Sequence, residues 1–414
     1  SNITDIDDKI ITRSAEEGCQ AGEIASRYES SWWDAVDRLG VLRPTHAPRA
    51  TEYVAKMVEA IGRLVQSGHA YEGPGGVWFA SESVPGYGML AHQSIQSLKS
   101  GARVEIDESK RSPIDFALWK LAKPNEPSWP SPWGDGRPGW HTECVVMSME
   151  LLGDYFDIHA GGMDLQFPHH ENERAQALAL GHRFCHHWMH HAFVEVGGEK
   201  MSKSLGNFTS LTDLLAKSDP RSYRLLVLRA QYRSPMEVTV DSISDATDAL
   251  SRLDSLARRL AGLSQQELPY HLDKELVNRF RKRMDDDLDT PRACAIIFEA
   301  IRAANTQIDS GKLDLAAITG STAIELASSV GLFARSTSYG AGGSVAGGNH
   351  ASGQGTASQN EVMPSEIVSL ASEREAARAA KEWGLADELR VQIEGAGWLV
   401  EDGSGKSTYR PKQG

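Results

Sequence analysis

Hydrophobic positions recur at helical spacing in three parts of the chain. In residues 51–67 the apolar side chains fall on one face of a helix, and Gly68 follows as a stop signal. The same spacing recurs in residues 243–260 and 293–308. The pattern therefore predicts an amphipathic helix early in the chain and a helical bundle beyond Leu211.

Other segments carry the signals of strands and turns. Residues 70–83 place apolar side chains on both sides of a Gly-Pro-Gly-Gly turn, which predicts a β-hairpin. Residues 155–158 and 193–196 are short apolar runs on either side of a helix that begins near Pro168. This alternation predicts a parallel α/β layer. Residues 105–139 are rich in Pro, Gly and Trp and are predicted to form ordered loops around a site.

The last part of the chain is set apart by a change of composition. Residues 335–362 consist mainly of Gly, Ser, Ala, Asn and Gln, which predicts a flexible tether. Beyond it, helical patterns at 366–383 and 385–393 precede short strand patterns at 398–400 and 407–410. These four segments predict a small α+β module.

Composition narrows the class of protein. The 414 residues are 40% hydrophobic and 24% charged, and a chain of this length forms roughly two to four domains. No apolar run approaches the roughly 18 residues of a membrane span, so a membrane protein is excluded. The formal charge of −13 excludes a generally basic nucleic-acid-binding surface but leaves room for a local basic groove. The four cysteines are far apart and form no Cys-x-x-Cys pair, which favours the cytoplasm.

A first candidate site combines sulfur, nitrogen and oxygen donors. Pro168 suits the first turn of a helix, so His169 and Glu173, four residues apart, share one face. Cys144 lies upstream in the run Gly-Trp-His-Thr-Glu-Cys. A thiolate, an imidazole and a carboxylate together suit zinc and leave one coordination position open.

The spacing alone leaves other interpretations open. The thiol is also explained as a small buried apolar group, and the histidine and glutamate as an ordinary helix pair. His170 and Glu171 are alternative donors, although they leave the shared face. The histidine-rich run 185–191 also invites a metal interpretation, but its alternation favours a strand with His190 at a useful end.

A second candidate site is the run Lys-Met-Ser-Lys-Ser, which places Lys200 and Lys203 in a loop between glycines. Two mobile ammonium groups can neutralise a developing pyrophosphate. The alternative is a solvated turn.

Together these motifs resemble the bacterial cysteinyl-tRNA synthetases, a class I family. The blocks that resemble the family, in family order, are 2–10, 115–120, 129–144, 157–173, 200–207, 232–235 and 374–398. The resemblance implies an α/β fold: a class I Rossmann-like catalytic domain with an inserted connective peptide, then a helical bundle and a small α+β module. The implied boundaries are 1–210 for the catalytic domain, with its insertion at about 20–135, 211–334 for the stem-contacting tRNA-binding bundle, 335–362 for the linker and 363–414 for the anticodon-recognition module.

The resemblance also implies roles for single residues around the amino acid. Cys144, His169 and Glu173 become three of the four ligands of one zinc ion per chain. Thr4, Trp140 and His159 match positions that surround the bound amino acid. Trp140 would form a wall of this pocket, and His159 would support it.

For the nucleotide, Gly162 and Asp164 resemble the segment that approaches the ATP ribose. Lys203, helped by Lys200, would stabilise the pyrophosphate leaving group, and Mg²⁺ is expected with the ATP. The implied activity is a cysteine–tRNA ligase: ATP-dependent activation of L-cysteine to the adenylate, then transfer to tRNA(Cys). Zinc selects cysteine because serine offers a poorer ligand, so editing is unnecessary.

The same resemblance implies basic residues that contact tRNA, and a cellular location. The residues expected to contact tRNA phosphates are Arg374, Arg378, Lys381 and Arg390. A cytoplasmic monomer without a membrane partner is expected.

The sequence also departs from the family. Members begin with about 70 further residues that hold the first strand, another zinc-binding cysteine and a His-x-Gly-His motif, and the chain is therefore predicted to be truncated, poorly stable and inactive. Gln231 stands where a histidine is usual before Tyr-Arg-Ser.

Two alternative functions remain. One is the cysteine ligase of mycothiol synthesis, with an aminosugar-inositol acceptor, and the other is a non-catalytic tRNA-binding paralogue.

Overall fold

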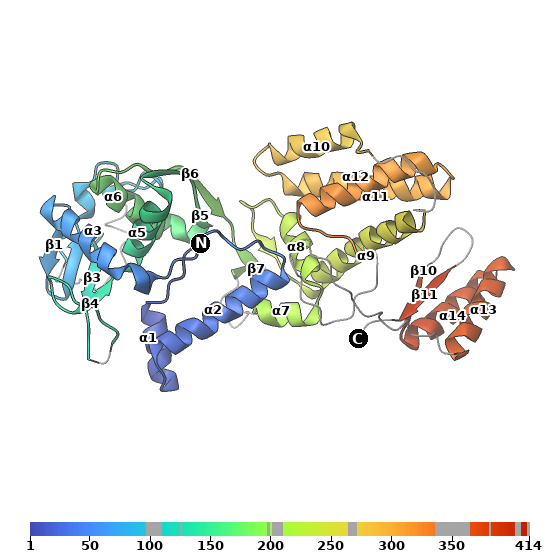
Figure 1. The fold of residues 1–414 in the computed structure, drawn as a ribbon, viewed down its shortest axis with the longest axis horizontal. Helices are drawn as coiled ribbons and strands as arrows, with labels where there is room; N and C mark the ends of the chain where they lie inside the picture. The colour runs from blue at the N-terminus through green and yellow to red at the C-terminus, as the bar shows by residue number, and fades with distance from the viewer. Residues whose placement is uncertain are drawn as a thin grey trace, which may run out of the picture. The chain divides into compact units, whose positions relative to one another are not determined.

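The computed structural model divides the chain into two compact units (Figure 1). The first comprises Ser1–Asp248 with Lys282–Cys294, and the second comprises Ala249–Arg281 with Ala295–Gly414. The structure describes residues 1–96, 110–124, 126–196, 199–200, 210–263, 271–335, 365–380, 382–401 and 407–411. Among these residues no helix has both the length and the apolar character needed to cross a membrane.

The first unit begins with helices. These are α1 (Asp8–Glu17), α2 (Ala21–Arg38), a 3-10 turn (Ala50–Tyr53) and α3 (Val54–Gln66). Asp7 caps α1 by accepting a hydrogen bond from the amide of Lys9. The face of α3 that the sequence predicted to be apolar is buried, so that prediction is confirmed.

An antiparallel sheet packs beside α3. Its strands, in spatial order, are β1 (Ala70–Gly73), β2 (Gly76–Phe79), β3 (Phe116–Leu121) and β4 (Gly136–Pro138). The predicted hairpin is confirmed, whereas the prediction of loops throughout 105–139 was wrong for β3 and β4.

The glycines of this region explain the error. A Cβ on Gly136 would lie 2.3 Å from the carbonyl oxygen of Lys120, and one on Gly139 would lie 2.0 Å from that of Ala117. These glycines therefore serve close strand packing rather than a loop.

A parallel α/β layer carries the predicted site. Its elements are α5 (Trp140–Leu152), β5 (Tyr155–Gly162), a 3-10 turn (Met163–Leu165), a π-helical turn (Gln166–His170), α6 (Glu171–Ala179) and β6 (Phe184–His191). Strands β5 and β6 pair in parallel, and Gly162 lies opposite His191 at their carboxyl ends. A parallel α/β layer is therefore confirmed, but the prediction of its second strand at 193–196 was wrong, because residues 184–191 pair with β5 and residues 194–196 belong to another sheet. Phe156, Phe184 and Cys185 form its core with Val145 and Ala177.

A small sheet follows in the order β8-β7-β9. Its strands are β7 (Val194–Val196), β8 (Glu199–Lys200) and β9 (Met236–Glu237). Strand β7 pairs antiparallel with β8 and parallel with β9. Between β8 and β9 lie α7 (Leu211–Lys217) and α8 (Pro220–Leu228), capped by Ser210 and Asp219.

The helical region predicted beyond Leu211 is confirmed. It continues with α9 (Val240–Gly262), α10 (Lys274–Met284), α11 (Thr290–Asp309) and α12 (Leu313–Ser329). In the second unit, Gly320 allows α12 to approach Leu260 and Ala304, because a Cβ there would lie 2.7 Å from the Leu260 side chain.

The C-terminal module contains α13 (Ser365–Ala379), α14 (Trp383–Gly395), β10 (Trp398–Glu401) and β11 (Thr408–Pro411), as predicted. Arg374 is only 1% exposed. Its guanidinium donates to the Ala386 carbonyl (3.2 Å) and to the Ser407 hydroxyl (2.8 Å). The prediction that Arg374 contacts tRNA phosphates is therefore wrong, because this side chain joins the elements of the module. Residues 336–362 of the predicted tether and Lys381 lie outside the described residues.

Candidate metal centre

The three predicted zinc ligands converge at one place. The Cys144 Sγ lies 3.5 Å from Nε2 of His169, and that nitrogen lies 2.7 Å from Oε1 of Glu173. The three donor atoms all lie within 4.8 Å of one another. The structure thus brings together the residues that the sequence singled out for this site.

Local structure explains how they meet. Cys144 lies in the second turn of α5, which begins at Trp140. The backbone is extended at Phe167, and the chain then turns into α6, which begins at Glu171. His169 and Glu173 therefore lie one helical turn apart and face the side of α5 that carries the thiol.

The carboxylate of Glu173 is fully buried. Burial raises its pKa, but the imidazoles of His159 and His169 outweigh this effect and lower the pKa to about 2. His159 Nε2 lies 2.8 Å from Oε2, yet neither carboxylate oxygen makes a hydrogen bond of good geometry with the described residues. Each carboxylate oxygen thus has a ring nitrogen within 2.8 Å, so a cation bound here could take one oxygen and one imidazole nitrogen as ligands.

The donor set fits zinc. Bond lengths of about 2.3 Å to sulfur and about 2.0 Å to nitrogen give a tetrahedral edge of about 3.5 Å, which matches the separation between Cys144 and His169. The contact between His169 and Glu173 is shorter than such an edge, so the carboxylate has to turn slightly. Burial, and then the carboxylate of Glu173, raise the pKa of the Cys144 thiol well above its ordinary value. A divalent cation is the group that offsets this and makes the thiolate stable.

His141 orients one of these ligands. Its Nδ1 lies 2.9 Å from Nδ1 of His169, and burial lowers the pKa of His141 to about 3, so its ring is neutral. This hydrogen bond occupies Nδ1 of His169 and so leaves Nε2 facing Cys144. Sequence reasoning missed His141, although it lies three residues before Cys144 and therefore on the same side of α5.

A second set of donors shares the same carboxylate. His159, His170 and Glu173 also place their donor atoms within 4.8 Å of one another. His170 Nδ1 lies 2.8 Å from His190 Nε2, and burial lowers the pKa of His170 to about 3. Gly161 makes room for this ring, because a Cβ there would lie 2.8 Å from its Cε1. The sequence placed His170 off the shared helix face, yet the fold brings its ring nitrogen within 4.8 Å of the Glu173 carboxylate.

The residues predicted around the amino acid lie beside the cluster. The Trp140 ring is 4.2 Å from the His169 ring, centroid to centroid, and Trp140 is 45% exposed. Asn2 Nδ2 donates to the Thr4 hydroxyl (3.4 Å) and to the Cys144 sulfur (3.5 Å). Asn2 was missed, since a lone asparagine carries no spacing signal.

The residues predicted around ATP are only partly visible. Gly162 ends β5, and a Cβ there would lie 2.5 Å from Oδ1 of Asp164, so the two residues are in close contact. Lys200 lies in β8, where its backbone pairs with Glu195. Lys203 lies outside the described residues.

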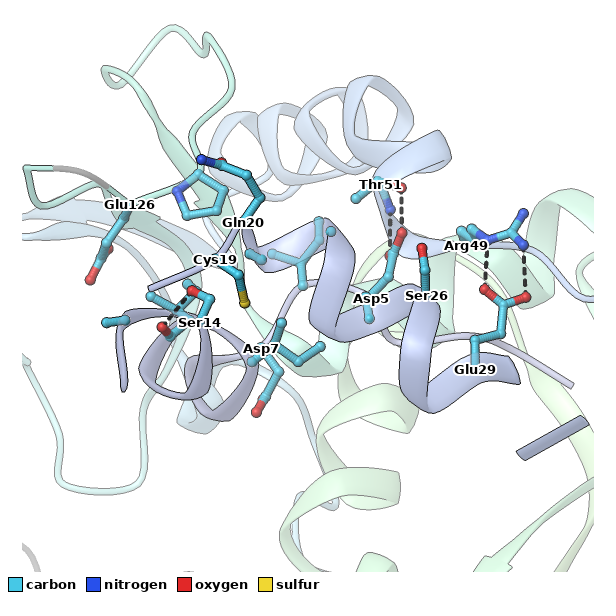
Figure 2. A pocket seen from close by; sticks show the side chains of 18 of the residues that line it. Asp5, Asp7, Ser14, Cys19, Gln20, Ser26, Glu29, Arg49, Thr51 and Glu126 are labelled. Carbon is cyan, nitrogen blue, oxygen red and sulfur yellow. Dashed lines mark hydrogen bonds and ion pairs between the residues drawn. The ribbon is translucent and has the colours of Figure 1, made fainter. Parts of the chain in front are cut away.

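A cavity of about 810 Å³ is lined mainly by the first residues of the chain, among them Asp5, Asp7 and Cys19 (Figure 2). None of the predicted site residues lines it. Two of its charged groups already have partners: Asp5 accepts from the Thr51 amide, and Glu29 is paired with Arg49. The chemistry therefore belongs to the cluster and not to this cavity.

Comparisons with known proteins agree with this geometry. Residues 1–248 match the family model of the class I (C) tRNA synthetase catalytic domain, and residues 279–334 match that of the DALR domain. The chain is 43% identical to a protein named cysteine–tRNA ligase from Alkalilimnicola ehrlichii, over 99% of this chain and 86% of that protein. It is 44% identical to one of the same name from Stutzerimonas stutzeri, over 99% of this chain and 85% of that protein.

Solved structures support the fold. The methionyl-tRNA synthetase of Mycobacterium tuberculosis in complex with methionyl-adenylate aligns with a TM-score of 0.55 at 15% identity, over 78% of this chain and 80% of that one. This likeness concerns the fold alone. On the family models and the relatives together, the chain belongs to the cysteine–tRNA ligase family of class I tRNA synthetases.

Proposed function

We propose that the chain is a cysteine–tRNA ligase that activates L-cysteine with ATP, as the adenylate, and transfers it to tRNA(Cys). The observation that carries this proposal is the buried convergence of Cys144, His169 and Glu173. Family membership supplies the reaction, and this cluster supplies the means of choosing the amino acid.

Cys144, His169 and Glu173 would hold one zinc ion. When bound, the ion offers an open position to the substrate thiolate, and a serine hydroxyl is a much poorer ligand. The loss of a coordinate bond separates serine from cysteine more strongly than a pocket that depends only on the size of one atom. Selection of cysteine at this step makes a separate editing site unnecessary.

Residues of the chain prepare this site. His141 fixes the orientation of His169. The exposed Trp140 ring forms a wall over His169, and Thr4 lies near the sulfur of Cys144 through their common donor Asn2. We assign the bound cysteine to the space beside Trp140 and Thr4. His159 would support this pocket through its contact with Glu173.

The nucleotide is assigned to the carboxyl end of β5. Gly162 allows the ribose to approach the backbone, and the Asp164 carboxylate accepts hydrogen bonds from its hydroxyls. Lys200 and Lys203 stabilise the pyrophosphate that leaves as the cysteine carboxylate attacks the α-phosphate, together with Mg²⁺.

We assign the tRNA to the helical region and the C-terminal module. Arg378, Lys381 and Arg390 remain the proposed phosphate contacts of the module, whereas Arg374 serves its core. The proposed protein is a cytoplasmic monomer.

The test uses the whole chain loaded with Co²⁺, whose thiolate bands report on sulfur ligands. We expect one ion per chain, a spectral change with cysteine and none with serine. Cys144→Ala should lose the ion, whereas Cys294→Ala, the matched control at another buried thiol in a helix, should keep it. Equal responses to cysteine and serine would refute the proposal.

The acceptor is tested separately. Radiolabelled cysteine should be transferred to tRNA(Cys) and not to an aminosugar-inositol. Transfer to the aminosugar alone would replace this proposal by the mycothiol-type ligase, and metal binding without any cysteine activation would favour the non-catalytic paralogue.

A further inference from the structure

Asp287 lies in the turn between α10 and α11 and accepts hydrogen bonds from three consecutive residues of a distant loop. Arg233 grips the carboxylate with two parallel bonds, from Nε and from Nη2, both of 3.0 Å. The Tyr232 hydroxyl donates at 2.8 Å and the Gln231 amide at 3.4 Å. A forked arginine–carboxylate pair fixes direction as well as distance. We call Asp287 with residues 231–233 the Asp287 latch.

The backbone of the turn is strained in support of this contact. Asp287 has φ of 52° and Leu288 has φ of 53°, the left-handed region that residues with a side chain rarely adopt. Aspartate tolerates this conformation better than leucine does. Two such residues in succession persist only where the surroundings hold them, and the latch supplies that hold.

The other side of the latch leads directly to the small sheet. The Tyr232 carbonyl accepts from the Ala192 amide at 2.8 Å, and the Met236 amide donates to the Phe193 carbonyl at 3.0 Å. Glu195, in the central strand β7, pairs with Glu237 of β9 on one side and with Lys200 of β8 on the other. The loop held by Asp287 therefore sets the position of β9. Strand β9 pairs with β7, and β7 in turn pairs with β8.

We propose that Asp287 is a positioning residue for Lys200. By holding residues 231–233, it keeps the three short strands in register and so fixes where Lys200 leaves the sheet. The same contact ties the turn between α10 and α11 to the strand that serves the pyrophosphate. This inference rests on the proposed function insofar as Lys200 acts on pyrophosphate, whereas the ordering of the sheet is independent of it.

Gln231 has a part in the latch. Its side-chain oxygen accepts from the Arg233 amide at 2.7 Å while its nitrogen donates to Asp287. Gln231 thus links the backbone of the loop to the Asp287 carboxylate. The departure from the family's usual histidine falls on a residue of this contact, where an amide supplies both a donor and an acceptor.

The first test is amide hydrogen exchange of the whole chain, read at Ala192, Lys200, Met236 and Val238. Asp287→Asn keeps a residue that tolerates the left-handed backbone but turns an amide donor toward Arg233. We expect exchange at these amides to accelerate by about threefold to tenfold, with no change in α5.

The matched control is Asp286→Asn. Asp286 is the preceding residue, is exposed, and its side chain makes no hydrogen bond or ion pair within the described part of the chain. Its exchange pattern should equal that of the unmodified protein. Tyr232→Phe, which removes one donor and changes neither charge nor backbone, should give a smaller acceleration at the same amides. Unchanged exchange in Asp287→Asn, or acceleration at Met236 and Val238 without any at Lys200, would overturn the proposal.

The second test is cysteine-dependent exchange of pyrophosphate into ATP. We expect Asp287→Asn to lower kcat while the KM for cysteine stays unchanged, because the metal cluster is untouched. A raised KM for cysteine with normal kcat would overturn the positioning role. If the unmodified chain shows no exchange, as the sequence predicts, the hydrogen-exchange result alone decides whether the latch orders the sheet.

Discussion

Glu143 offers a quantitative test of the electrostatics beside the metal centre. It lies in the first turn of α5 and is 1% exposed. Oε2 of its carboxyl has no hydrogen-bond partner in the described residues. Burial, above all, raises the pKa of Glu143 to about 9, against the lowering effect of the Thr4 hydroxyl. The folded protein therefore holds a neutral carboxylic acid at pH 7, and glutamine is its isosteric mimic.

The sign and size of the effect follow from linkage. Below pH 4.5 the carboxyl is protonated in both the folded and the unfolded chain and has no effect on their balance. As the pH rises from 4.5 toward 9, only the unfolded chain releases the proton, so the free energy of unfolding falls. At about 1.36 kcal/mol per pH unit, this amounts to at most about 3 kcal/mol at pH 7 and about 5 kcal/mol at pH 8. Glu143→Gln removes this loss.

The assay is urea unfolding of the metal-free protein at pH 5 and pH 8, followed by tryptophan fluorescence. Relative to the unmodified chain, Glu143→Gln should gain about 2–4 kcal/mol more at pH 8 than at pH 5. Glu150→Gln, at an exposed position of the same helix, should follow the unmodified chain at both values. Parallel pH profiles for the unmodified chain and Glu143→Gln would show that this carboxyl is not held neutral.

Three further predictions concern the packing around the cluster and in the C-terminal module. His141→Ala should weaken zinc binding by about 10-fold to 100-fold, measured by chelator competition, because His169 loses the bond that orients it; unchanged affinity would contradict this. Gly161→Ala should displace the ring of His170, seen as a shift of its imidazole resonances, and an unchanged spectrum would show that the ring has room. Arg374→Met should destabilise the C-terminal module by about 2–4 kcal/mol, since it removes the two buried hydrogen bonds that the guanidinium donates, and protected amides in α13 that exchange no faster would refute the point.

Local periodicity was enough to predict part of the site. His169 and Glu173 are four residues apart on a helix, and their contact follows from helical geometry alone. The identity of Cys144 as their partner depended on chemistry and on the family resemblance, because no local rule links α5 to the π-helical turn. The alternation of strands and helix also predicted a parallel layer, but it placed the second strand at 193–196, whereas β5 pairs with β6 at 184–191.

What the sequence did not reveal depends on contacts between distant residues. Strand β3 was missed because its partners in β2 lie about 40 positions earlier, and the glycines beside it imitate a loop. The His170 ring fits near Glu173 beside Gly161, where a side chain would collide with it. Arg374 was expected at the surface because arginine is rarely buried. It is buried here because acceptors inside the module receive its hydrogen bonds. The boundaries proposed for the domains stay predictions.

The shared carboxylate of Glu173 has an evolutionary consequence. Two imidazoles from different elements, His159 and His169, face its two oxygens, so a change in any one of the three alters the surroundings of the other two. Single replacements at these positions are each damaging, and a compensated state lies at least two steps away. Pairwise mutational scanning of the three positions should therefore show strong epistasis, and descendants of such a protein should keep or lose the trio as a block.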